Sequence, residues 1–192
     1  MKAFISILFS LVAFSAIAQT GTYRRTDKTG ASCTIAVQKN QSRLIGEIFA
    51  WWNTSSGTHG AFSGQGVLND NICTLRTQKE SECSVRLNFS KNALNALFSD
   101  CKSENLPEDF AGNYTKITTQ IPGEYLIKTA KAYFYKTAKS NSRLRTYLIK
   151  GDRVYIDLEN IIDDKWVFVN YKNISGNISS GYMLWQNFNL NP

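Results

Sequence analysis

Apolar and polar residues alternate over short stretches through most of the chain after residue 20, with the two-residue period of half-buried β-strands. The clearest stretch is 83–89, where Cys83, Val85 and Leu87 alternate with polar or charged positions. Gly46 lies inside an expected strand and is a candidate position for a β-bulge. Between turns rich in Asn, Asp, Gly and Ser, the first half is predicted to hold strands at 33–37, 44–52, 62–67, 72–75, 83–89 and 110–116.

Residues 93–98 fit two interpretations. The spacing of Leu94, Leu97 and Phe98 suits one face of a helix, whereas a strand would complete a hairpin with 83–89. In the hairpin, antiparallel register places residue 83 opposite residues 99–101. That register favours a disulfide Cys83–Cys101 and leaves Cys33–Cys73 as the second pair, although four cysteines allow three connectivities.

The alternating pattern begins again after the polar segment 118–123, which ends in Pro122-Gly123 and is predicted to be a linker. Five or six short strands follow, a density typical of a small closed barrel. They are expected at 132–135, 147–149, 154–156, 166–171 and 181–185. We therefore predict an all-β protein with two small domains, residues 19–117 and 124–192.

The first 18 residues have a different pattern. Lys2 precedes an apolar run, and Ala16 and Ala18 supply the small residues that signal peptidase accepts. The run is shorter than the roughly 20 apolar residues of a membrane span. We predict a cleaved signal peptide over 1–18, a mature chain that begins at Gln19, no integral membrane segment after cleavage, and a periplasmic or secreted location.

All four cysteines lie between residues 33 and 101. In an exported chain an even number of cysteines predicts disulfides, here two. There is no Cys-x-x-Cys pair and His59 is the only histidine, so we expect neither a metal site nor another cofactor. The segment around His59 contains no acidic residue, and no thiol is expected to be free. We therefore expect a binding protein rather than an enzyme.

The chain is basic, with 22 Lys and Arg against 15 Asp and Glu and a net charge of +7. Residues 128–150 contain no acidic residue and hold a run of basic ones: Lys128, Lys131, Lys136, Lys139, Arg143, Arg145 and Lys150. Such a stretch suits an anionic partner, and it also suits a face that is only solvated. Nucleic acid is not expected as the partner of an exported protein.

Four stretches of the second half, 132–135, 147–154, 166–171 and 181–184, follow the order found in a known domain. Over residues 124–187 the chain resembles the bacterial SH3-like domain of exported proteins. Tyr182 stands where that family usually has Trp in its closing strand. The resemblance implies a small β-barrel that binds peptidoglycan or docks beside cell-wall enzymes.

The first half is more weakly similar to a cysteine-containing periplasmic β-domain that accompanies lysozyme-inhibitor-like modules. The similar stretches are 21–23, 83–89 and 110–114, together with Cys101. Lys102 follows that cysteine where the family often has Gly. This resemblance implies a location and a fold, and no inhibitory residue is carried over.

Aromatic side chains are the candidate ligand contacts. Tyr133 and Tyr135 share one face of a strand and Phe134 lies on the other, so either the tyrosines or the phenylalanine fills the core. We predict that the tyrosines face outward and form a ligand face with four further residues: Tyr171, Tyr182, Lys136 and Arg145.

In the first half, Trp51 and Trp52 are neighbours in a predicted strand. One indole then faces the core and the other faces outward, where it would suit a sugar or protein contact. The alternative is that the neighbouring polar loop covers both.

The function predicted from these features is that of an exported, non-catalytic binding protein of the bacterial cell envelope. Its SH3-like module would bind peptidoglycan or dock to a wall-associated protein. The alternative is a periplasmic inhibitor or immunity protein that neutralises an exported toxin or wall hydrolase by stoichiometric binding. The partner is a cell-wall polymer in the first case or an envelope protein in either case.

Overall fold

The computed structural model of the protein describes residues 19–77, 82–106 and 108–190. Within these ranges the regular structure is β-strand with five short 3-10 turns, and there is no α-helix. The prediction of an all-β protein is therefore confirmed. The predicted signal peptide at 1–18 lies outside the described residues.

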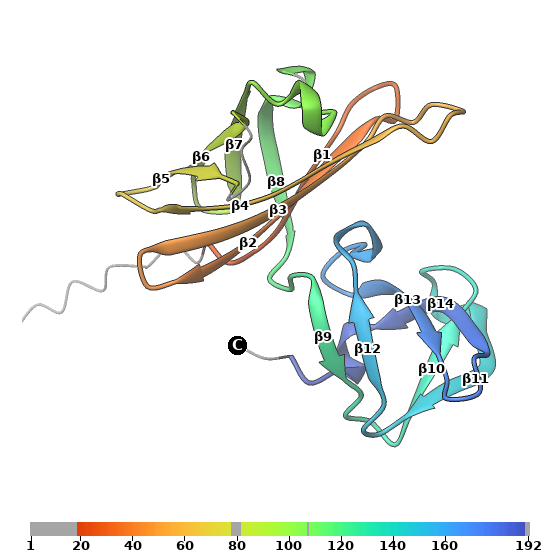
Figure 1. Ribbon diagram of the computed structural model, residues 1–192. Helices are drawn as coiled ribbons and strands as arrows, with labels where there is room; N and C mark the ends of the chain where they lie inside the picture. The colour runs from red at the N-terminus through yellow and green to blue at the C-terminus, as the bar shows by residue number, and fades with distance from the viewer. Residues whose placement is uncertain (1–18, 78–81, 107, 191–192) are drawn as a thin grey trace, which may run out of the picture.

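The first half of the chain is a closed barrel of eight antiparallel strands (Figure 1). Each strand pairs with the next in the sequence, and the last pairs with the first. Short connections suffice for this order, and closure leaves the barrel without a free sheet edge. The strands are β1 (Gly21–Thr26), β2 (Ser32–Asn40), β3 (Arg43–Trp51), β4 (His59–Val67), β5 (Ile72–Arg76), β6 (Ser84–Phe89), β7 (Ala93–Ser99) and β8 (Gly112–Thr118).

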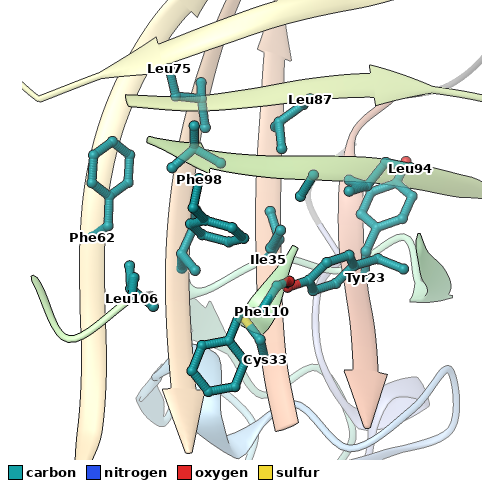
Figure 2. Close-up of a cluster of buried hydrophobic side chains, with 14 of the residues drawn as sticks. Tyr23, Cys33, Ile35, Phe62, Leu75, Leu87, Leu94, Phe98, Leu106 and Phe110 are labelled. Carbon is teal, nitrogen blue, oxygen red and sulfur yellow. The ribbon is translucent and has the colours of Figure 1, made fainter. Parts of the chain in front are cut away.

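Side chains from alternate strand positions fill the barrel. On β6, Val85, Leu87 and Phe89 are buried, while Arg86 between them is exposed. Figure 2 shows side chains of this core that come from strands on different sides of the barrel and converge on its interior. An eight-stranded barrel is just wide enough for its side chains to fill it. Each large apolar side chain that is fully buried contributes about 1.5–3 kcal/mol to folding.

The strand β3 runs through Gly46 without a bulge, so that prediction is wrong. Gly46 keeps an unbroken register between Val37 on β2 and Gly64 on β4. A Cβ atom at Gly46 would lie 2.4 Å from Cδ1 of Leu75. A larger residue at this position would therefore require the Leu75 side chain to move.

The hairpin interpretation of residues 93–98 is confirmed, because β6 and β7 pair with Ser84 opposite Ser99. The disulfide Cys83–Cys101 joins the two strand ends, with its Cα atoms 4.4 Å apart. This bridge is the one that the antiparallel register predicted.

The second predicted disulfide, Cys33–Cys73, is wrong, because both cysteines are free and buried. Cys73 lies beside Gly66 on β4, where a Cβ atom would be 2.7 Å from the Cys73 Sγ. Gly66 is opposite Leu44 of β3, and Leu44 is opposite Lys39 of β2. Lys39 is six residues along β2 from Cys33. At the rise of an extended strand the two cysteines are about 20 Å apart. A disulfide needs Cα atoms within about 7 Å.

Six further strands form two sheets in the second half. One sheet has four strands in the order β11-β10-β14-β13, and the other pairs β12 with β9. Their bounds are β9 (Gly123–Leu126), β10 (Lys131–Tyr135), β11 (Arg143–Ile149), β12 (Arg153–Ile156), β13 (Trp166–Lys172) and β14 (Ile178–Leu184). The hydrogen bonds of these strands thus do not form the single closed barrel that was expected. Both sheets share one core, which includes Phe134, Val154 and Met183. The SH3-like resemblance stays a prediction.

This second core extends to the outer surface of the eight-stranded barrel. Ala36 of β2 is buried in it, and Phe49, Ile117 and Ile121 pack against it. The connection between β8 and β9 is also held, because Thr22 Oγ1 donates to the carbonyl oxygen of Gln120 at 2.6 Å. The division into domains at 19–117 and 124–192, with a linker at 118–123, stays a prediction.

Arg24 of β1 forms a polar tie between the barrel and the second group of strands. Its Nη1 donates to the carbonyl oxygen of Ile162 at 3.0 Å, and its Nη2 donates to that of Ile161. Its Nε donates to Thr34 Oγ1 at 3.1 Å. Burial lowers the pKa of Arg24, and the charge of Asp163 opposes that shift. The guanidinium stays protonated at any physiological pH, so these donors are permanent.

Thiol labelling tests the cysteine assignment. We expect an alkylating reagent to modify two cysteines, Cys33 and Cys73, when the protein is unfolded without reduction. In the native state both should react slowly, because burial raises the pKa of Cys33 to about 12 and that of Cys73 to about 11. Mass spectrometry counts the labels, and no label in the unfolded, unreduced protein would contradict the assignment.

Substitution of Arg24 tests the tie between the two groups of strands. We expect Arg24→Ala to lower the free energy of unfolding by about 1.5–3 kcal/mol, because hydrogen bonds from a charged donor are lost. Arg24→Lys should lower the free energy of unfolding by less than Arg24→Ala, because the ammonium keeps the charge but lacks the planar fork of donors. Urea denaturation measures both, with Arg86→Ala on the exposed side of β6 as the control. Equal effects of Arg24→Ala and the control would contradict the assignment.

Candidate functional site

The four-stranded sheet buries one face and leaves the other at the surface. On β10, Ala132 and Phe134 are fully buried, whereas Tyr133 and Tyr135 are half-buried and Lys131 is exposed. The prediction that Phe134 fills the core and both tyrosines face outward is therefore confirmed.

Cross-strand register extends the two tyrosines into a row of aromatic side chains. Tyr133 is opposite Tyr147 on β11, and Tyr135 is opposite Tyr182 on β14. Tyr182 is in turn opposite Phe168 on β13. We call these residues and Trp166, whose ring contacts that of Tyr135, the outer aromatic face: Tyr133, Tyr135, Tyr147, Trp166, Phe168 and Tyr182.

The rings of the outer aromatic face meet edge to face. Ring centroids are 5.5 Å apart for Tyr133 and Tyr147, and 5.0 Å apart for Tyr135 and Trp166. Those of Phe168 and Tyr182 are 5.2 Å apart. Such pairs add about 0.5–1.5 kcal/mol beyond the burial of area. The rings hold one another in place, which gives a rigid contact surface.

Three residues of this face were missed by the sequence analysis: Tyr147, Trp166 and Phe168. The alternation within 166–171 was a usable signal, since Trp166 and Phe168 share a side of that strand. Trp166 is almost fully covered, although it lies on the side of β13 away from the second core. Its cover comes from neighbours on the outer face itself, among them Tyr135.

Basic side chains lie over the rings. Lys131 Nζ is 4.7 Å from the ring centroid of Tyr147, and Arg143 Cζ is 4.7 Å from that of Tyr133. Lys165 Nζ is 5.7 Å from the ring of Trp166. The two basic residues predicted for the ligand face, Lys136 and Arg145, are exposed near these positions.

The four strands of this sheet, all within the described residues, contain no Asp or Glu. Their charged residues are Lys131, Arg143, Arg145 and Lys172. A sheet face with cations and without acids attracts negative charge at a range set by the ionic strength. This face therefore presents aromatic rings and cations at the surface.

Tyr171 does not belong to this face, which corrects the prediction. On β13 the residues Trp166, Phe168 and Asn170 point to the outer side, and Tyr171 is one position out of phase with them. It packs against the second core instead. The reason is the pleat of the strand, which sends successive side chains to opposite faces.

The neighbouring tryptophans face opposite sides of the barrel wall, as predicted. Trp52 packs against the first core, and Trp51 is 37% exposed. The ring of Trp52 meets that of Phe110 edge to face at 5.1 Å, and its Nε1 donates to the carbonyl oxygen of Asn105 at 3.3 Å. Trp52 is thus structural. Trp51 lines a cleft beside the barrel, separate from the outer aromatic face.

In comparisons with known proteins, no protein-family model, curated protein or solved structure matches the chain. The function is therefore inferred from the geometry of the site. Within the ranges that the structure describes, no helix is long and apolar enough to cross a membrane. In the same part of the chain, no three His, Cys, Asp or Glu side chains are grouped so that they could hold a metal ion.

Two alanine substitutions distinguish the faces of β10. We expect Phe134→Ala to lower the free energy of unfolding by about 3–5 kcal/mol, because it leaves a cavity in the core. Tyr135→Ala should cost about 1–2 kcal/mol, because it removes a half-buried ring and its contact with Trp166. Thermal and urea unfolding measure both variants. Equal losses would place Tyr135 in the core.

Proposed function

We propose that this protein is an exported, non-catalytic binding protein of the cell envelope, and that its outer aromatic face holds an anionic wall polymer such as peptidoglycan or the surface of an envelope protein. The observation that carries the proposal is the four-stranded sheet without acidic residues, whose rings are flanked by Lys131 and Arg143. The resemblance of the second half to the SH3-like domain of exported proteins implies the same role.

The residue types on the face suit binding. Aromatic rings provide large contact area at a low entropic cost, and Tyr adds a hydroxyl for hydrogen bonds. Arg143 lies on the edge strand β11, where it is exposed and its guanidinium lies over the Tyr133 ring. A guanidinium suits carboxylates or phosphates. Tyr147, at 40% exposure, offers the most open of the rings.

Export agrees with the cysteine chemistry. The disulfide Cys83–Cys101 suits an oxidising compartment. The leader-like pattern of residues 1–18 supports the same location from the sequence. These two features support a partner outside the cytoplasm.

Co-sedimentation with purified sacculi tests the proposal. We expect the mature protein to sediment with sacculi at low ionic strength and to be released by salt, since the Debye length falls from about 30 Å at 0.01 M to about 3 Å at 1 M. Tyr182→Ala should weaken binding about tenfold or more, as for an aromatic anchor. The matched control is Tyr155→Ala, which removes a tyrosine that is 60% exposed on β12.

Two results would contradict the proposal. Unchanged binding by Tyr182→Ala would remove the outer aromatic face from the interaction. Absence of sedimentation, together with a tight one-to-one complex with an exported hydrolase or toxin, would favour the inhibitor or immunity function instead.

A further inference from the structure

A cleft lies between the outer surface of the barrel and the 3-10 turn η4 (Leu158–Asn160). It consists of two adjoining hollows of about 650 and 490 Å³ that share Phe49 and Glu159. The larger is lined on the barrel side by β3 and β4 residues, and the smaller by β1, β2 and β3 residues. Ligand sites often form where two packed units meet.

Strand register places hydroxyl groups beside an exposed indole on the barrel surface. Thr26 of β1 is opposite Ser32 of β2, which is opposite Trp51 of β3. All three line the smaller hollow, and Asn160 and Glu159 line it from the side of η4. The smaller hollow therefore places the exposed Trp51 indole among hydroxyl, amide and carboxylate side chains.

The walls of the cleft are held in place. Arg24 binds the carbonyl oxygens of Ile161 and Ile162, just after η4. Phe49 packs against the second core and also stacks on His59, with ring centroids 5.7 Å apart. A site whose walls are fixed before the ligand arrives loses little entropy on binding.

The cleft is lined mainly by negative charges, whereas the outer aromatic face carries positive ones. Glu47, Asp157 and Glu159 line the larger hollow. Arg24 is the one cation among the lining residues of either hollow, and its donors already bind two carbonyl oxygens and Thr34. Carboxylates repel an anionic ligand and accept hydrogen bonds from hydroxyl groups.

We propose that this cleft is a binding site for a neutral oligosaccharide, with the Trp51 indole as the stacking surface for one sugar ring. The apolar C–H face of a pyranose packs on an indole. Its hydroxyl groups find acceptors and donors in Glu159, Asn160 and Ser32. This site is separate from the outer aromatic face and goes beyond the function proposed for that face.

Titration of the mature protein with two neutral probes, cellotetraose and the β-1,4-linked tetramer of N-acetylglucosamine, tests the inference. We expect at least one to bind with micromolar to millimolar affinity and to shift the Trp51 indole N–H signal in NMR spectra. Trp51→Ala should weaken binding about tenfold or more, and Glu159→Gln by a smaller factor. Because the ligand is neutral, high salt should change the affinity little.

Tyr155→Ala is the matched control, because it truncates an exposed aromatic residue outside both hollows. Circular dichroism checks that Trp51→Ala remains folded, as expected for a residue at the surface. Binding of neither probe, or binding that Trp51→Ala leaves unchanged, overturns the inference. Loss of probe binding in Tyr182→Ala with normal binding in Trp51→Ala overturns it too, since the sugar then lies on the outer aromatic face.

The two proposals fail independently. Salt-sensitive sedimentation with sacculi that needs Tyr182, without probe binding, contradicts the oligosaccharide site alone. Salt-insensitive probe binding that needs Trp51, without any effect of Tyr182→Ala on sedimentation, contradicts only the function proposed for the outer aromatic face.

Discussion

Pairing of β8 with β1 is the constraint on which the rest of the structure depends. It closes the barrel and brings Lys116 opposite Tyr23, at the start of the described chain. The strand that ends at Thr118 therefore leaves the barrel beside β1, and β9 begins a few residues later. The second group of strands must then pack on the surface formed by β1, β2 and β3, where Arg24 meets the carbonyl oxygens before Asp163.

The pleat of the strands determines which side chains can bind. On β10 it buries Phe134 and turns Tyr133 and Tyr135 outward, and on β13 it sends Tyr171 to the core. On β3 it turns Phe49 and Trp51 to the outside of the barrel, while Trp52 after the strand packs inside. Both candidate sites thus follow from a two-residue period read on neighbouring strands.

The outer aromatic face and the cleft beside η4 differ in charge. The outer aromatic face has cations and no acidic residue in its strands, whereas the cleft beside η4 has three carboxylates against one engaged guanidinium. One surface therefore favours an anion and the other a neutral, hydroxyl-rich ligand. A wall polymer that combines sugar rings with acidic groups would meet both requirements.

The sequence alone determined the all-β class, most strand positions, the β6–β7 hairpin and the bridge Cys83–Cys101, because these depend on short-range alternation and local register. The strand β1 was not predicted, since Tyr23 is its only large apolar residue and its pairing with β2 and β8 holds it. Tertiary structure decided that Cys33 and Cys73 lie far apart, which other rings join Tyr133, and that Trp51 faces a cleft. Those outcomes depend on which distant strands become neighbours, and the closed barrel and the packing of the second core on its surface decide that.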